Sequence, residues 1–279
     1  MHVRRSRQAI GLPLVLAAAV VALGAVGCTA GSGASAGAEG PGAVAPSSPA
    51  SDSGAPSASA SVSASGSAAA SVVTGRWLTA DEVVAAAVPD AEVPGSYTNP
   101  VSIRTFRKPD PRFKSPSDLA CGRVLDAAHA EMNVNTAPTV AEQTFNWKDD
   151  AYGSYSYLVS YKKSAAQIVF TLLRDGLTTC RYYEQEGPSG LQKNTVTTVP
   201  APPLGDEAVQ FEISTPTEAG RHVTQYTVVR TGHCVATFTK SSDGRVGQAF
   251  PPAVIARQIT LLVEAQEEAQ QEAQEEARR

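Results

Sequence analysis

The chain has 279 residues, with 23 Lys or Arg against 27 Asp or Glu, so its formal charge at pH 7 is −4. This acidic balance argues against nucleic acid as the main partner, because phosphate binding needs clustered basic side chains. It also argues against a polybasic grip on anionic lipid. The length is enough for one well-buried domain with further segments outside it.

Residues 1–27 have the three parts of a removable export signal. Arg4, Arg5 and Arg7 form a basic start, residues 10–26 are almost wholly apolar, and small residues precede Cys28. An apolar stretch of roughly 17 residues is at the short limit for spanning a bilayer. The sequence therefore predicts that everything after this segment is exported.

Residues 25–28, Ala-Val-Gly-Cys, resemble the lipobox of bacterial lipoproteins. The resemblance implies that the Cys28 thiol carries a diacylglyceryl group and that several acyl chains hold the protein on the outer face of the cell membrane. Ala25 departs from the motif, which usually has Leu there. Ala25 and Gly27 also fit an ordinary small-x-small cleavage site, so a released soluble protein is one alternative and an uncleaved membrane anchor is another.

Residues 28–75 follow as a segment of Ala, Ser, Gly and Pro with almost nothing else, in which only Glu39 and Asp52 are charged. Such a composition buries too little apolar surface to offset the entropy of ordering, so we predict a disordered linker. Its mean span would be about 35–40 Å. The alternative to a passive spacer is a spacer that also carries sugars on Ser and Thr.

The predicted ordered elements begin near Trp77 and alternate between helices and strands. Thr79 and Glu82 form a capping box for a short helix that ends before Pro89. Residues 101–106 alternate as a strand, and Ser117 and Asp118 can cap a helix that runs to residue 128. A loop is expected at 109–116.

Two antiparallel strands are predicted at 140–147 and 153–161, joined by a turn. An amphipathic helix is expected at 164–177, because apolar residues recur there at helical spacing. Shorter strands at 180–185 and 195–199 precede three longer ones. The longer strands are centred on residues 209–213, 223–230 and 234–240.

A last helix is predicted from Pro251-Pro252, with Ile255, Ile259 and Leu262 as its buried stripe. Residues 264–279 change to Glu, Gln and Ala, with Ala at every fourth position. That spacing drifts around a helix, so we predict a solvated helical tail, with a coiled-coil arm as the alternative.

These elements define an α+β domain at residues 76–263. The economical arrangement is an antiparallel sheet of five to seven strands with helices on one face and the other face partly open. Four segments result: the signal at 1–27, the lipidated Cys and linker at 28–75, the domain at 76–263 and the tail at 264–279.

The chain has four cysteines. With Cys28 used for lipid, Cys121, Cys180 and Cys234 remain. In an oxidising compartment, three cysteines give one disulfide and one leftover thiol. Cys234 lies within an apolar strand pattern, which favours a small buried hydrophobic residue over a reactive thiol.

The order of the ordered elements resembles a known family. Cys121-Gly122-Arg123-Val124-Leu125 begins a helix, two strands and the 164–177 helix lead to Cys180, and a hairpin containing Val228-Val229-Arg230 and Cys234-Val235 precedes the last helix. This is similar to the PknH-like extracellular sensor domain, found on actinobacterial kinases and as stand-alone lipoproteins. The resemblance covers residues 77–263.

The resemblance implies an antiparallel sheet with helices, a ligand groove and no enzymatic activity. It also implies a Cys121–Cys180 disulfide, which would close a loop of about 60 residues, and Cys180–Cys234 is the rival pairing. The family usually has a second disulfide, but the partner expected for Cys234 near Asn194 is missing.

The sequence contains no pattern that is typical of a catalytic or metal-binding site. His222 and His233 fall at opposite ends of one hairpin, and no H-x-H or C-x-x-C spacing occurs. His233 and Cys234 are adjacent in a strand pattern, so their side chains point to opposite faces and cannot act as a base and a nucleophile. We therefore expect no metal and no cofactor.

One candidate binding site remains, an aromatic stripe of Trp147, Tyr155, Tyr157 and Tyr161 on one face of two adjacent strands. If that face is open, aromatic rings and hydroxyls suit a glycan or a small apolar ligand. The alternative is that these rings pack under the 164–177 helix as core.

The sequence thus predicts a membrane-anchored extracytoplasmic lipoprotein that acts as a non-enzymatic binding or sensing module. Its expected partners are the membrane, through the lipid anchor, and an envelope component, a small molecule or a neighbouring protein. The alternative is an envelope hydrolase or an accessory protein of cell-wall metabolism. That alternative requires a His such as His129 or His222 in a pocket with a carboxylate and a hydroxyl.

Overall fold

The computed structural model describes residues 76–104, 114–132, 140–148, 150–162, 164–188, 190–218, 220–244 and 249–279. The predicted signal at 1–27, Cys28 and the linker to residue 75 lie outside the described residues. Most of the predicted loop at 109–116 lies outside them too.

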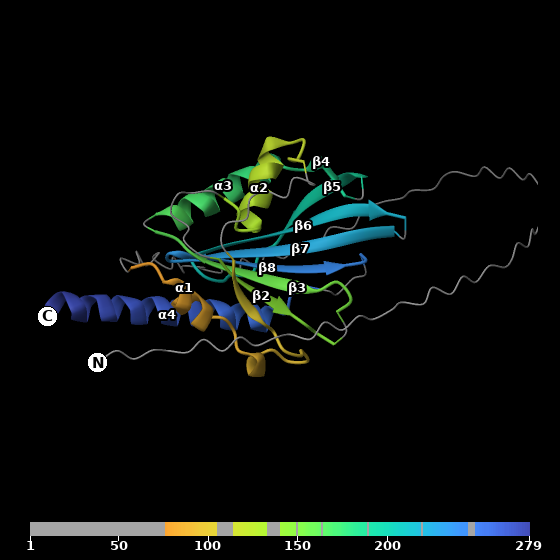
Figure 1. The fold of residues 1–279 in the computed structure, drawn as a ribbon. Helices are drawn as coiled ribbons and strands as arrows, with labels where there is room; N and C mark the ends of the chain where they lie inside the picture. The colour runs from red at the N-terminus through yellow and green to blue at the C-terminus, as the bar shows by residue number, and fades with distance from the viewer. Residues whose placement is uncertain are drawn as a thin grey trace, which may run out of the picture. The chain divides into compact units, whose positions relative to one another are not determined.

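The described chain forms one antiparallel sheet in the order β1-β2-β3-β8-β7-β6-β5-β4 (Figure 1). The strands are β1 (Val101–Arg104), β2 (Val140–Phe145), β3 (Ser154–Ser160), β4 (Tyr182–Gly187), β5 (Gly190–Val199), β6 (Glu207–Thr217), β7 (Gly220–Thr231) and β8 (Cys234–Ser242). The predicted α+β class is confirmed. The predicted five to seven strands are too few, because the short strands β1 and β4 both join the sheet as its edges.

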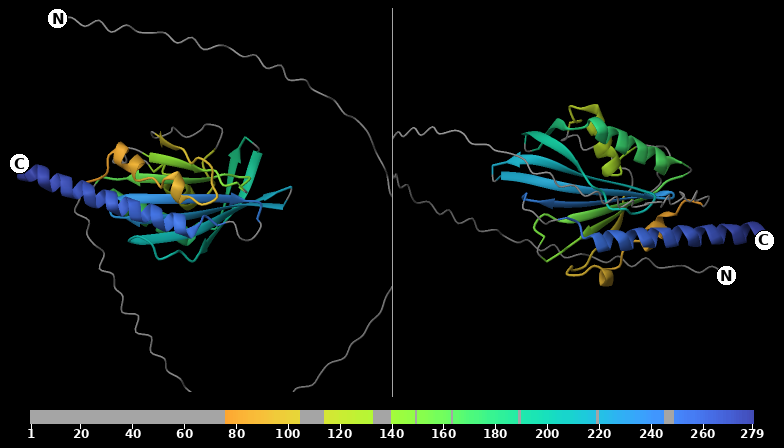
Figure 2. Two further views of the ribbon diagram at one scale, coloured as in Figure 1. Left: turned by 90° about the horizontal axis from the view of Figure 1, so that it is seen from below. Right: turned by 180° about the vertical axis from the view of Figure 1, so that it is seen from behind.

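Helices cover both faces of this sheet (Figures 1 and 2). They are α1 (Ala80–Ala85), a 3-10 turn (Asp90–Glu92), α2 (Leu119–Ala128), α3 (Ala165–Thr179) and α4 (Pro252–Arg278). One apolar core lies between the sheet and α2 and α3, and the other lies between the sheet and α1 and α4. The expectation of helices on one face is therefore wrong.

The reason for two covered faces is the composition of the central strands. In β7, Val228 belongs to the core under α3 and its neighbour Val229 to the core over α4. In β8, Val235 and Ala236 divide in the same way. Strands that are apolar at consecutive positions must be buried on both sides. The alternation of residue types in β2 and β3 alone does not predict that both faces of the sheet are buried.

The start of the domain is fixed by the predicted capping box. The Thr79 hydroxyl accepts from the Glu82 N–H and the Glu82 carboxylate accepts from the Thr79 N–H. Arg76 donates to the same carboxylate at 2.8 Å, and this hydrogen bond is the main cause that lowers the pKa of Glu82 to about 2. Arg76 also reaches Glu272 of α4 at 3.2 Å.

The predicted solvated tail is one continuous helix with the rest of α4, and its first part is docked. The Gln266 side chain is 3 % exposed. It accepts from the His233 N–H at 2.8 Å and donates to the Thr231 carbonyl at 3.2 Å. Ala269 is 2 % exposed. The packed part of α4 therefore extends past the boundary predicted at residue 263, because a buried amide supplies partners to the β7–β8 turn.

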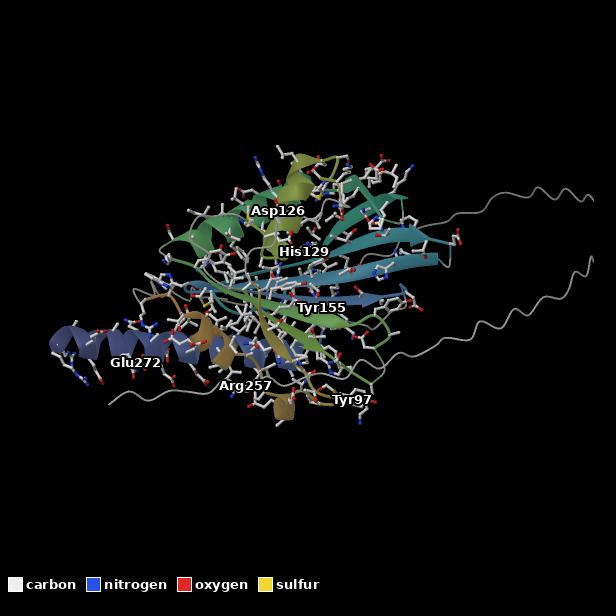
Figure 3. All side chains as sticks on the ribbon, in the orientation of Figure 1. Tyr97, Asp126, His129, Tyr155, Arg257 and Glu272 are labelled. Carbon is white, nitrogen blue, oxygen red and sulfur yellow. A yellow bond between two sulfur atoms is a disulfide. The ribbon has the colours of Figure 1, made fainter. Side chains whose placement is uncertain are left out.

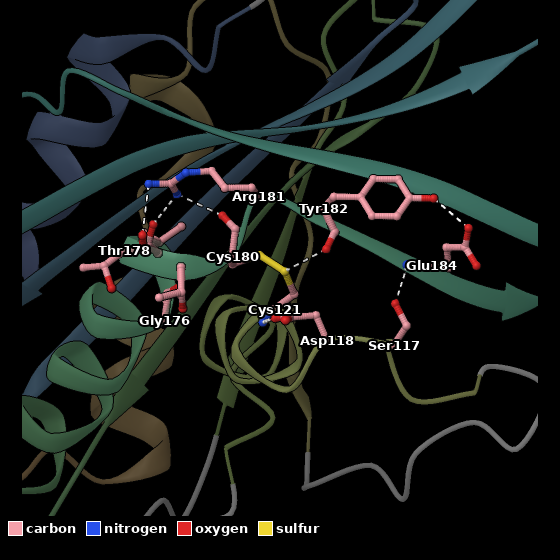
Figure 4. The surroundings of a disulfide bond; sticks show 11 residues. Ser117, Asp118, Cys121, Gly176, Thr178, Cys180, Arg181, Tyr182 and Glu184 are labelled. Atoms are coloured by element: carbon pink, nitrogen blue, oxygen red, sulfur yellow. Dashed lines mark hydrogen bonds between the residues drawn. A yellow bond between two sulfur atoms is a disulfide. The ribbon is translucent and has the colours of Figure 1, made fainter.

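The two helices on one face are held together by a disulfide between Cys121 and Cys180, with Cα atoms 4.9 Å apart (Figure 4). The pairing implied by the family resemblance is confirmed, and Cys234 is a free, buried cysteine, as expected. Gly176 lies at the same contact. A Cβ there would be 2.8 Å from a Val124 methyl and 3.1 Å from the Ala120 carbonyl, so glycine permits the close approach of α2 to α3.

We expect the double variant Cys121→Ser, Cys180→Ser to lose about 4 kcal/mol of unfolding free energy, because the disulfide closes a long loop in the unfolded chain. Urea denaturation of the oxidised protein and the variant measures the difference. A reducing agent should lower the stability of the wild type and leave the double variant unchanged. An equal response of both proteins would contradict this role.

Candidate functional site

The structure divides the predicted aromatic stripe between the two faces of the sheet. The β2–β3 register pairs Thr144 with Tyr155 and Phe145 with Ser154, so Phe145 and Tyr155 point to opposite faces. Trp147 follows Phe145: their rings stack at 5.2 Å, and Phe250 meets Trp147 edge-on. The expectation that Trp147 shares a face with the three tyrosines is wrong, because Trp147, two residues beyond the end of β2, packs with Phe145 in the core on the opposite face.

The three tyrosines line the face under α2 and α3 and become more buried along β3. Tyr155 is half-buried and Tyr161 is 1 % exposed in the core. Tyr157 packs against the same core with the Arg104 guanidinium 5.0 Å from its ring centre, and burial raises the pKa of Tyr157 to about 12. This arrangement matches the alternative in which the rings serve as core. A binding role for Tyr155 stays a prediction.

His129, the C-cap of α2, is half-buried and belongs to a polar cluster with Tyr226 and Arg104 (Figure 3). Its Nε2 is 3.0 Å from the Tyr226 hydroxyl, and its carbonyl accepts from Arg104 at 2.6 Å. Burial, with the nearby Arg104 charge, lowers the pKa of His129 to about 4. The imidazole is therefore neutral at physiological pH and is held by a phenol, which is not the arrangement that a hydrolase base requires.

A second polar cluster lies at the β2–β3 turn on the other face. The Ser154 hydroxyl donates to Asp150 at 2.6 Å, and Lys240 donates to the same carboxylate at 2.9 Å. Burial alone would raise the pKa of Asp150, but these two bonds hold it below its usual value. Ser154 is fully buried, and an ammonium paired with a carboxylate cannot take the serine proton. This cluster joins the turn to β8.

The remaining predicted candidates stay apart. His222 lies at the start of β7, and His233 lies in the turn at the other end of that strand. The described residues contain no group of three or more His, Cys, Asp or Glu that could hold a metal ion. Burial raises the pKa of the Cys234 thiol to about 12, so it is an inert core residue.

An open pocket of about 350 Å³ lies where the end of α3 meets the end of β5 and the start of β6. It is lined by Arg174, Leu177, Thr178, Arg181, Thr198, Val199, Ala201, Ala208, Val209 and Gln210. The pairing of β4 with β5 stops at Tyr182–Thr195, whereas β5 continues beside β6 to Val199. The unequal lengths of β4 and β5 leave this corner uncovered.

The disulfide positions one wall of this pocket. Cys180 ends α3, and Arg181, the next residue, folds back over the end of the helix (Figure 4). Its guanidinium donates to the carbonyls of Leu177 at 2.6 Å, Cys180 at 3.0 Å and Thr178 at 3.1 Å. A cation at this helix end is favourable, because the carbonyls there carry partial negative charge.

Sequence reasoning did not find this pocket. Its residues come from α3, the short connection after α3, two strands and the connection between those strands, and no motif joins them. The one available signal was Arg181 directly after a cysteine that ends a helix, because a basic residue at that position can reach the last carbonyls.

No family model matches the chain, and no curated protein matches it. Among solved structures, the chain is similar to the crystal structure of the extracellular domain of PknH from Mycobacterium tuberculosis, with a TM-score of 0.51 and 11 % identity. The match covers 68 % of this chain and 98 % of that chain. The expected resemblance to PknH-like sensor domains is thus supported at the level of the fold.

Within the described residues, no helix combines the length and apolar character needed to cross a membrane.

We expect the unfolding free energy to fall by on the order of 2–3 kcal/mol between pH 7 and pH 4.5 through His129 alone. The unfolded histidine, with an ordinary pKa of 6.5, takes up a proton in this range, while the folded one, with a pKa of about 4, does not. His129→Gln should flatten the dependence, and His222→Gln, at the half-buried start of β7, is the matched control. Urea denaturation at a series of pH values measures it. Equal slopes for the wild type and His129→Gln would contradict this origin.

Proposed function

We propose that this chain is a lipoprotein anchored through Cys28 to the outer face of the cell membrane, and that its domain binds a ligand without catalysing a reaction. One observation supports the second part of this proposal, which is ligand binding without catalysis. The groups with catalytic potential, the half-buried His129 and the largely buried Asp150–Ser154–Lys240 cluster, are bonded to each other or to core residues. The open pocket instead presents arginine, threonine and glutamine side chains beside apolar ones.

The anchor is supported by the lipobox-like residues 25–28 and by the order of the segments after them. The contacts of Arg76 and Thr79 fix the start of the folded domain next to the end of the predicted linker. A buried disulfide fits an oxidising compartment. The fold similarity to an extracellular domain fits the same location.

The pocket beside α3 is the proposed ligand site, in place of the aromatic stripe. Its volume lies at the lower end of the range of about 300–1,000 Å³ that small-molecule sites occupy. An envelope component or a small molecule fits this size. The hydrolase alternative receives no support, because the lining residues include no carboxylate, histidine or cysteine to act as a base or nucleophile.

We expect cells grown with a labelled fatty acid to incorporate the label into the wild-type chain and not into Cys28→Ala, because the thiol is the proposed site of the thioether. The membrane fraction should hold the wild type, and the variant should leave it. Cys234→Ala, which removes the buried free thiol, is the matched control and should keep the label. A wild type without label, or a labelled Cys28→Ala, would refute the anchor.

A further inference from the structure

We propose that the pocket beside α3 takes an amphipathic anion, a small molecule with one carboxylate and a short acyl chain. This assignment rests on the proposed function, because it names the class of ligand for the same pocket. It follows from three features of the pocket: an apolar wall, a cationic rim and an arginine that can change its partner.

The apolar wall on the α3 face comes from Leu177 and Val209, which both pack in the core under α3. Val199, Ala201 and Ala208 line the edge of the pocket, and Ala208 packs against the core on the opposite face. Small and β-branched residues on β5 and β6 leave a shallow space that methylene groups can fill. Because each buried methylene contributes roughly fourfold in affinity, even a short acyl chain would add substantially to binding.

The cationic rim is formed by Arg174 and Arg181, and the described lining residues include no Asp or Glu. Arg181 is fixed, because three of its N–H groups donate to the carbonyls at the end of α3. A guanidinium has five N–H groups, so two are left over for an acceptor in the pocket. The Thr198 hydroxyl adds a neutral donor beside it, whereas the Thr178 hydroxyl already donates to the Asp175 carbonyl at 2.6 Å. This set favours a carboxylate and disfavours a cation.

Arg174 differs from Arg181 because its side chain is 53 % exposed and its partner is a neighbouring carboxylate. Its Nη1 donates to Oε1 of Glu207 at 3.2 Å, while Oε2 of Glu207 accepts from Arg230 at 2.8 Å. Arg174 can therefore turn to a bound carboxylate and leave Glu207 paired with Arg230. The exchange leaves no buried charge without a partner, so the cost that usually follows the loss of an ion pair is avoided.

The test uses the mature chain from residue 28 with Cys28→Ala, so that it is soluble without detergent, and calorimetric titration with decanoate, 1-decanol and inorganic phosphate below the micelle range. We expect decanoate to bind at least about tenfold more tightly than decanol, and octanoate to bind more weakly than decanoate by about fourfold per methylene. No decanoate binding, equal binding of decanol, or phosphate binding as tight as decanoate would overturn the assignment.

Two pairs of variants locate the site. Arg174→Gln should weaken decanoate binding about tenfold, the usual scale of one charge-assisted hydrogen bond, and Arg278→Gln, at the exposed end of α4, should leave it unchanged. Thr198→Phe places a ring in the pocket and should abolish binding. Thr197→Phe, the adjacent exposed position that points to the other face, should not. Unchanged binding in Arg174→Gln and Thr198→Phe would place the anion elsewhere and refute the proposal.

Failure of this assignment is distinguishable from failure of the proposed anchor. If decanoate does not bind while the wild-type chain keeps its Cys28-dependent fatty-acid label, the ligand class alone is wrong. If the label is absent, the anchor is wrong, whatever the titration shows.

Discussion

Burial on both sides of the central strands is the constraint on which the rest of this domain depends. Because β7 and β8 carry apolar residues at consecutive positions, α3 must cross one face and α4 the other. After β3 the chain leaves the sheet and passes through α3 to the far edge at β4. It then returns strand by strand to β8, which lies beside β3. The pocket lies at the corner where that return begins, since α3, the end of β5 and the start of β6 line it.

Much of the local structure was predictable, because it depends on neighbours in the sequence. The capping box at Thr79 and Glu82, the α3 helix and the β2–β3 pair all follow from residue type and spacing. The Cys121–Cys180 pairing required the family resemblance, since three cysteines alone leave the choice open. Gly176 lies inside α3, where a glycine is expected to weaken the helix. The close approach of α2 explains why a glycine occupies this position.

The tertiary features were not predictable, because they depend on which elements meet. The number of strands in one sheet, the second covered face and the separation of Trp147 from Tyr155 are all decided by long-range pairing. The pocket also depends on long-range contacts, because β4 and β5 differ in length and their residues show no pattern that marks an opening. Sequence motifs identify sites whose residues are close together in the sequence. The pocket beside α3 has no such motif.

The entry point of the chain has a mechanical consequence for a domain held by a tether. Leu78 is 1 % exposed, and its N–H donates to the Ser160 hydroxyl of β3 at 2.8 Å. Under the proposed membrane anchor, tension arriving through Arg76 is therefore taken up first by α1, by β3 and, through the Arg76–Glu272 ion pair, by α4. The pocket borders β5 and β6, and β8 and β7 lie between these strands and β3. A pull strong enough to detach the first turn of the domain would leave the corner that holds the pocket, and the disulfide beside it, unstrained.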